Sequence, residues 1–270
     1  MRRNLAKNAA FVMAASSASF GIAMYVEYKN RSSLLSLKDL RRKITDSFSS
    51  SFSSTSMVEK AKTFWSNQRA SQKTIIFLIA ANYAVFFLWR VPALHSFMYR
   101  NFMHSITTRP INHITSSFSH ISFLHISLNM FGLWSFGSTL HDLMGREQFL
   151  AFYFSAALFS SFASHLWKMR QGNLTRSLDA SGAVLGSIGA LSNTPGLSVS
   201  TIFLPFISVP MSTAVPLMMA FDVIGLMKNW QTVDHAAHLG GALFGLFYCN
   251  YGYKIWQNRH EIVDFFRIKR

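Results

Sequence analysis

Long apolar runs separated by short polar stretches dominate this chain from residue 74 onward. A helix needs about 20 apolar residues to cross the hydrocarbon core of a bilayer. The six runs predicted to be membrane helices cover residues 74–91, 121–140, 149–167, 180–194, 214–227 and 236–256. The run at 180–194 is too short to cross alone. Prolines at 195, 205 and 210 oppose a continuous helix before the next run.

The N-terminal region has a different pattern. A basic start, without an acidic residue before Glu27, precedes a small, apolar run at 9–26. This is typical of a mitochondrial presequence, but the run also approaches the minimum length of a spanning helix. We expect a retained transmembrane helix, with a cleaved targeting segment as the alternative. The predicted organisation is a basic start and helix at 1–27, a polar linker at 28–72, a six-helix domain at 73–257 and a basic tail at 258–270.

The linker is polar, basic and rich in serine, so we assign it no fold. Hydrophobic residues make up 50% of the 270-residue chain and charged residues 14%, which excludes an ordinary soluble domain. We therefore predict an all-α polytopic membrane protein. The net charge of +15 resides mostly outside the apolar runs, which favours contact with anionic lipid over nucleic acid. The single cysteine, Cys249, excludes an intrachain disulfide.

A serine and a histidine, Ser181 and His238, lie within the apolar runs and are each surrounded by small residues. Such residues are functional candidates in a membrane, and a serine with a histidine is the minimum for nucleophilic catalysis. Ser181 would lie in the first turn of its helix, where unpaired N–H groups suit a developing oxyanion. The alternative is a serine that caps its own helix.

Small residues beside both positions predict that the two helices approach closely. They recur every four residues, at Gly182 and Gly186 and at Ala237, Gly241 and Gly245. Such ridges allow close helix contact in membranes. We therefore expect Ser181 and His238 to come within hydrogen-bond reach.

The second core helix carries His125 and Asn129, four residues apart and hence on one face. Both side chains could donate to an oxyanion, or could join helices as structural polar contacts. His120 falls off this face and is predicted to be structural or to face a loop.

Three further residues are assigned on position alone. Asp234 either caps the last core helix or orients His238 from four residues away. Asp222 lies deep in apolar sequence. It is either a protonated acid in the core or forms a hydrogen bond to another helix. We expect His235 to face the membrane interface.

Together, His125-x-x-x-Asn129, Ala180-Ser181-Gly182 and the segment 234–245 resemble the rhomboid intramembrane serine proteases, with the motifs on the second, fourth and sixth core helices. The segments 89–92, 133–136 and 234–245 are similar to the mitochondrial, presenilin-associated rhomboid-like subgroup. That resemblance implies one extra helix before six, multi-pass residence in the mitochondrial inner membrane, single-pass transmembrane substrates and no metal or organic cofactor.

The resemblance also implies roles: Ser181 as nucleophile, His238 as general base and acid, and Asn129 and His125 as oxyanion donors with the Ser181 N–H. The family uses a serine–histidine dyad, so the aspartates receive no role. One departure is Asp179, which stands where the family has glycine. The predicted function is intramembrane serine endopeptidase; the alternative is a catalytically impaired rhomboid-fold protein that binds or escorts membrane helices.

Overall fold

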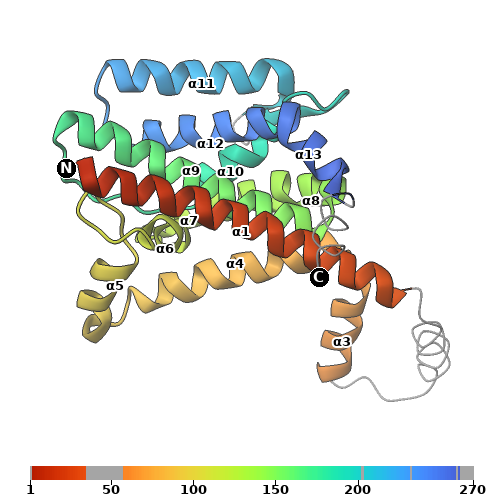
Figure 1. Cartoon of the computed structure of the whole chain (residues 1–270). Coiled ribbons are helices and arrows are strands. Elements are labelled where there is room, and N and C mark those ends of the chain that lie inside the picture. Colours follow the sequence, from red (N-terminus) through yellow and green to blue (C-terminus); the bar gives the residue numbers. More distant parts are fainter. Residues whose placement is uncertain (1, 35–56, 202–203, 232, 260, 262–270) are drawn as a thin grey trace.

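A computed structural model describes residues 2–34, 57–201, 204–231, 233–259 and 261 of the chain. Over these residues the protein is a helical bundle with one two-stranded sheet (Figure 1). The predicted all-α membrane fold is confirmed, apart from that small sheet. Three described helices are long and apolar enough to cross a membrane, within Asn4–Asn30, Ala70–Leu88 and Arg146–Gln171.

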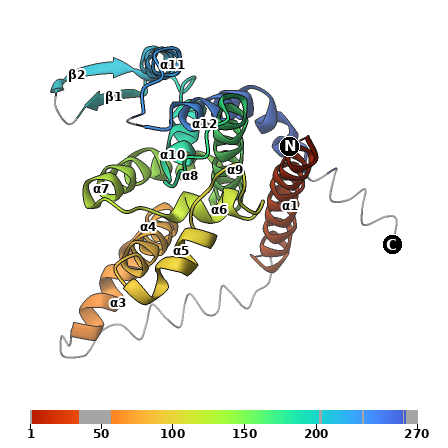
Figure 2. The ribbon, with the colours of Figure 1, turned by 90° about the vertical axis from the view of Figure 1, so that its left-hand side faces the viewer.

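The N-terminal helix α1 (Arg2–Leu34) is longer than the predicted run and extends into the region assigned to the linker. It lies along α9 and reaches the C-terminal end of the bundle (Figures 1 and 2). Glu27 forms a bidentate ion pair with Arg259, and each of its two carboxylate oxygens lies 2.6 Å from a guanidinium nitrogen. Phe20 stacks on Tyr248. The six-helix core therefore carries a seventh helix on its outside.

The linker region contains a second difference from the prediction. Residues 57–67 form helix α3 (Met57–Asn67), which was not expected. Its exposed side chains include the aromatic residues Phe64 and Trp65 as well as Lys60 and Lys62. The serine-rich part of the linker, at residues 47–54, lies outside the described residues.

The first three core spans match their predicted positions. They are α4 (Ala70–Leu88); α7 (Phe123–Gly132) continued through the π-helical segment η3 (Leu133–Gly137) into α8 (Ser138–Met144); and α9 (Arg146–Gln171). Between α4 and α7 the chain forms four short helices: η1 (Pro92–Leu94), α5 (His95–Asn101), α6 (Asn112–Thr115) and η2 (Ser116–Phe118).

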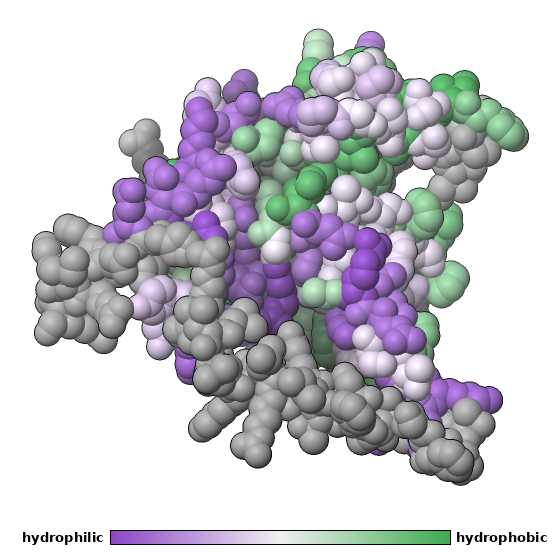
Figure 3. Space-filling model, turned by 90° about the vertical axis from the view of Figure 1, so that its right-hand side faces the viewer, coloured by the Kyte–Doolittle hydropathy of each residue, from purple (hydrophilic) through white to green (hydrophobic). Residues whose placement is uncertain are grey.

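The fourth span is the short helix α10 (Ser181–Ala190), as its length predicted. The proline-rich stretch after it forms an antiparallel hairpin of β1 (Ser198–Thr201) and β2 (Leu204–Pro210). Phe206 on β2 is almost fully exposed, and apolar surface gathers around this hairpin at the upper right of Figure 3. The prolines excluded a helix correctly, but they did not identify a strand pair.

The last spans are α11 (Met211–Met227) and α12 (His235–Phe247), the latter continued by η4 (Tyr248–Gly252) and α13 (Tyr253–Gln257). The closest packing in the bundle joins α10 to α12. A methyl group added at Gly241 would collide with the Gly182 backbone, and one at Gly245 with the Gly186 backbone. The predicted ridge-to-ridge contact is therefore present, and it sets the backbones that carry Ser181 and His238 against each other.

Candidate active site

Ser181 is the first residue of α10, and the side chain of Asp179 governs its surroundings. Asp179 Oδ1 accepts hydrogen bonds from the Ser181 N–H at 2.8 Å and from the Ser181 hydroxyl at 2.5 Å. The first bond closes the turn just before α10, whose N-cap residue is Ala180. The second holds the candidate nucleophile toward a carboxylate.

His125 approaches the other oxygen of the same carboxylate, with Nε2 3.5 Å from Asp179 Oδ2. The Ser181 N–H and His125 are two of the predicted oxyanion donors. The Asp179 carboxylate thus lies between the groups assigned to a negatively charged oxygen of the transition state. Asn129, the third predicted donor, is buried and donates instead to the His125 carbonyl at 3.1 Å.

His238 is joined to Asp222 of α11. The distance from His238 Nδ1 to Asp222 Oδ1 is 3.2 Å. An ionised carboxylate only accepts hydrogen bonds, so Nδ1 carries a proton, and in the neutral ring Nε2 keeps its lone pair. Asp222 therefore bonds another helix, one of its two predicted roles, and leaves His238 in the tautomer of a general base.

The same oxygen of Asp222 takes a second histidine, His235, whose Nδ1 is 2.7 Å away. The prediction that His235 faces the interface is wrong, because its side chain is buried against Gly225. A residue with any Cβ at position 225 would overlap the imidazole ring. The histidine is accommodated because its neighbour on α11 is a glycine.

The expected hydrogen bond between Ser181 and His238 is not formed in the part of the chain that the structure describes. The hydroxyl of Ser181 points to Asp179, and His238 Nδ1 points to Asp222. The two residues nevertheless lie at the start of adjacent helices whose backbones touch at Gly182 and Gly241. The helix arrangement meets the prediction, whereas the side-chain orientation does not.

His120 lies nearer to the serine than its position off the His125 face suggested. It is fully buried, and its Nε2 accepts the Ala180 N–H at 3.4 Å. Burial lowers the pKa of His120 to about 4, against the opposing charge of Asp179, so the ring is neutral. The structural role predicted for His120 corresponds to this support of the turn before Ser181.

Asp234 caps α12, the first of its two predicted roles, since its Oδ1 accepts the Ala237 N–H at 3.1 Å. Its other oxygen accepts from Ser164 at 2.5 Å and pairs with Lys168 at 3.1 Å. Burial opposes ionisation, but Lys168 and these hydrogen bonds outweigh it and lower the pKa of Asp234. The start of α12 is thereby fixed to α9.

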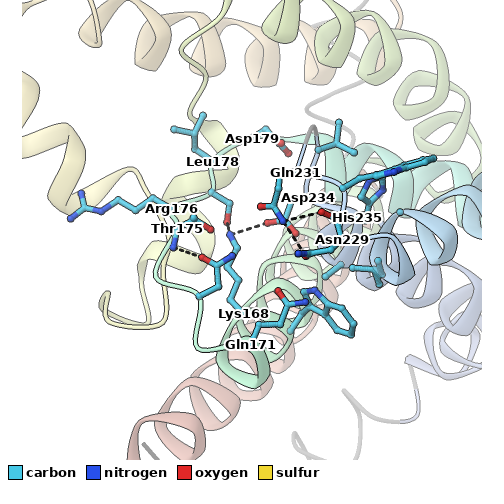
Figure 4. Close-up of a pocket in the computed structure, with 18 of the residues that line it drawn as sticks. Lys168, Gln171, Thr175, Arg176, Leu178, Asp179, Asn229, Gln231, Asp234 and His235 are labelled. Carbon is cyan, nitrogen blue, oxygen red and sulfur yellow. Dashed lines mark hydrogen bonds and ion pairs between the residues drawn. The ribbon is translucent and has the colours of Figure 1, made fainter.

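An open cavity of about 560 Å³ lies beside these residues, between the end of α9, the turn before α10 and the start of α12 (Figure 4). Asp179 and His125 line it, together with the Lys168–Asp234 pair. A second cavity of about 20 Å³, lined by serines and Asp179, has room for one water molecule. Water can therefore approach the carboxylate that holds Ser181.

Comparison with known proteins identifies relatives for most of this region. Residues 107–255 match the rhomboid domain, a range that includes Asp179, Ser181, Asp222 and His238. The match therefore covers more than half of the chain and every candidate site residue.

Curated relatives give longer alignments. The chain is 39% identical over 213 residues to presenilin-associated rhomboid-like protein A, mitochondrial, of Danio rerio, covering 77% of this chain and 56% of that protein. It is 40% identical over 204 residues to the Homo sapiens presenilin-associated rhomboid-like protein, mitochondrial (74% and 54%). Rhomboid protein 1, mitochondrial, of Saccharomyces cerevisiae is 35% identical over 179 residues (63% and 51%). The chain spans about half the length of these relatives.

Proposed function

The chain belongs to the rhomboid family, in its mitochondrial presenilin-associated rhomboid-like subgroup, and we propose that it is an intramembrane serine endopeptidase. It is a multi-pass protein of the mitochondrial inner membrane, as the sequence predicted. The observation that carries the proposal is the placement of Ser181 and His238 on two touching helices, with the His238 tautomer fixed by Asp222.

The reaction begins with transfer of the Ser181 hydroxyl proton to His238 Nε2. Oγ then attacks the scissile carbonyl carbon and gives a tetrahedral intermediate. Collapse of this intermediate breaks the C–N bond, and His238 returns its proton to the leaving amine. Water then attacks the acyl-enzyme with His238 as base, which releases the acid product and regenerates the serine.

Asp222 acts through His238 as a positioning residue. Its carboxylate holds Nδ1–H and stabilises the imidazolium that forms when Nε2 takes the proton. Because the same oxygen also holds His235, rotation of Asp222 is restricted from two sides. The sequence-based expectation of a simple dyad thus gains a third member in the proposed mechanism.

Asp179 must release Ser181 before the reaction. Its carboxylate occupies both the Ser181 hydroxyl and the Ser181 N–H, and it lies beside His125. A negative charge at this point opposes an oxyanion. The Asp179 carboxylate must therefore either move away with its turn or take up a proton. The structure then corresponds to a resting state, from which Ser181 N–H, His125 and Asn129 are freed to hold the oxyanion.

The substrate class proposed is a single-pass transmembrane protein with its scissile bond at or near the membrane. Attack requires an extended backbone, so residues that weaken the substrate helix should favour cleavage. The 560 Å³ cavity beside Asp179 supplies the water for deacylation.

A second candidate function rests on the same Asp179 contact. If the carboxylate never releases Ser181, the protein binds or escorts membrane helices without cleaving them. The bond from the Ser181 hydroxyl to Asp179, in place of His238, is the observation that favours this reading.

Cleavage of a membrane-anchored reporter by the purified full chain in proteoliposomes tests the proposal. We expect Ser181→Ala and His238→Ala to abolish cleavage. Ser187→Ala is the matched control, because Ser187 is a buried serine of the same helix whose hydroxyl donates to the Ala183 carbonyl of its own helix. Cleavage that persists in the folded Ser181→Ala protein would refute the mechanism.

A further inference from the structure

Three histidines from distant parts of the sequence meet in the interior, away from Ser181. His104 lies between α5 and α6, His113 lies on α6 and His165 lies on α9, and each is at most 1% exposed. One ring nitrogen from each lies within 4.8 Å of those of the other two. The rings of His104 and His113 have centroids 4.3 Å apart, so the three imidazoles form one compact group.

Hydrogen bonding fixes the protonation of His113 in a form suited to ligation. His113 Nε2 is 3.1 Å from Asn8 Oδ1 of α1, an oxygen that can only accept. The proton therefore sits on Nε2, and Nδ1 keeps a lone pair directed toward Ser161 at 2.9 Å. A histidine ligand whose second nitrogen donates to an amide or carbonyl oxygen is the usual outer-shell arrangement of metal sites.

His104 and His165 leave hydrogen-bonding capacity unused. His104 Nε2 faces His165 Nδ1 at 3.2 Å, while the buried His104 Nδ1 and His165 Nε2 lack partners in the described part of the chain. Whichever ring donates to the other, one N–H and one lone pair remain unsatisfied in the interior. Such unsatisfied groups are costly in the interior, so the hydrogen bond between the two rings does not by itself account for this pair of histidines.

We propose that His104, His113 and His165 form a binding site for one divalent transition metal ion, zinc foremost. Imidazole nitrogens suit zinc, and three histidines leave a fourth position for a hydroxyl or water. A tetrahedral zinc places ligand nitrogens roughly 3.3 Å apart, and the His104–His165 pair already has this separation. Side-chain shifts of about 1 Å bring in the third ring, given the 4.8 Å limit on the set.

The charge state of the group agrees with metal binding. Burial, followed by the proximity of His165, lowers the pKa of His113 to about 3, and burial lowers that of His104 well below its ordinary value. The rings of His104 and His113 are therefore neutral, the form in which an imidazole ligates a metal. Lys168, whose charge also acts on His104, is paired with Asp234 at 3.1 Å.

The ion would connect segments that lie far apart in the sequence. His104 pairs with Ser177 through two backbone hydrogen bonds of 2.9 Å, and Ser177 lies four residues before Ser181. His165 belongs to α9, and Asn8 extends the contact to α1. A bound metal therefore holds the chain before the nucleophile and the N-terminal helix to α9, and its predicted effect is stability.

A second group with metal-ligand chemistry, Asp222, His235 and His238, belongs to the proposed active site. A metal there would occupy the base, so the test must separate the two groups.

The full chain, carrying a purification tag free of histidine, is stripped with chelator, equilibrated with Zn²⁺ and freed of excess ion. Zinc per chain is then measured by mass spectrometry.

We expect one zinc per wild-type chain, and loss of that zinc in His113→Gln and in the double variant His104→Gln/His165→Gln. His141→Gln is the matched control, a buried histidine on α8 bonded to Thr74, and Asp222→Asn reports on the other group. Both should keep the zinc. Zinc should also raise the Tm of the wild type and not that of His113→Gln.

If the variants do not fold, the proposal can still be tested on the wild type. X-ray absorption of the bound zinc should then show three imidazole nitrogens at about 2.0–2.1 Å. A folded wild type without stoichiometric zinc would overturn the proposal. So would zinc that is lost in Asp222→Asn but retained in His113→Gln, or a shell dominated by carboxylate oxygen.

Discussion

One carboxylate oxygen of Asp179 accepts two hydrogen bonds from Ser181, at 2.5 Å from the hydroxyl and 2.8 Å from the backbone nitrogen. The second oxygen lies 3.5 Å from His125 Nε2. The carboxylate thus takes the place that the proposed mechanism reserves for the oxyanion. Any activity of this protein depends on how readily that contact opens.

Replacing Asp179 with glycine, the residue of the family pattern, should raise the rate of cleavage. A hydrogen bond to a charged group contributes about 1.5–3 kcal/mol, which corresponds to a gain of about tenfold or more if its opening limits the reaction. The measurement is kcat/KM on the membrane-anchored reporter. Asp179→Asn keeps the shape of the side chain and a weaker hydrogen bond, so its kcat/KM should lie between those of the wild type and Asp179→Gly. A loss of cleavage in a folded Asp179→Gly protein would instead make Asp179 part of the working machinery.

Asp222→Asn should lower kcat by about 10²–10⁴ while the protein stays folded. Asparagine can present an N–H to His238 Nδ1, which favours the tautomer whose Nε2 carries the proton. His235→Gln is the comparison, because His235 shares the Asp222 oxygen without being assigned a proton to transfer. We expect a smaller loss there. A change in the pH profile of kcat that is confined to Asp222→Asn distinguishes positioning of the base from loss of structure.

Gly241→Ala should weaken the contact between α10 and α12. The added methyl group meets the backbone of Gly182, which cannot rotate away, so the loss of stability should reach or exceed the roughly 1–3 kcal/mol typical of overpacking. Gly21→Ala is the matched control, another helical glycine with open space around it. Alanine there should be neutral or stabilising, by up to about 1 kcal/mol. Thermal unfolding in detergent measures both, and equal Tm values for the two variants would contradict the packing account.

Asp234→Ala should destabilise the protein by about 3–5 kcal/mol, because it leaves Lys168 buried without its partner. Asp234→Asn retains the cap on Ala237 and should lose less. The folded-state pKa of Asp234 is lowered, so its stabilisation is present above the unfolded pKa and disappears as pH falls through the folded pKa. The free energy of unfolding, measured from pH 7 down to pH 3, should therefore fall for the wild type. The fall should be smaller for Asp234→Asn.

Much of this arrangement could be predicted from the sequence because each signal was local. Apolar run length located the core helices, and the four-residue spacing of small residues predicted the contact at Gly182 and Gly241. Asp234 next to the start of a helix was identifiable as a cap. These inferences depend on periodicity and on residue chemistry within a few positions.

Other features depend on contacts between distant segments, which periodicity does not encode. Asp222 was conspicuous as an acid in apolar sequence, but its partners lie 13 and 16 residues away on another helix. His104 and His165 are 61 residues apart, and no spacing rule connects them. Asp179 was recognised as a departure from the family pattern, yet its two bonds to Ser181 required the conformation of the turn.

Covalent labelling of the full chain with a serine-reactive fluorophosphonate tests the central claim most directly. The account predicts a phosphonyl adduct on Ser181, found by peptide mass spectrometry. The adduct should be absent in Ser181→Ala, strongly reduced in His238→Ala and unchanged in Ser187→Ala. The contradicting result is that neither the folded wild type nor folded Asp179→Gly acquires an adduct on Ser181, although both bind a transmembrane peptide. That result would identify a binder of membrane helices.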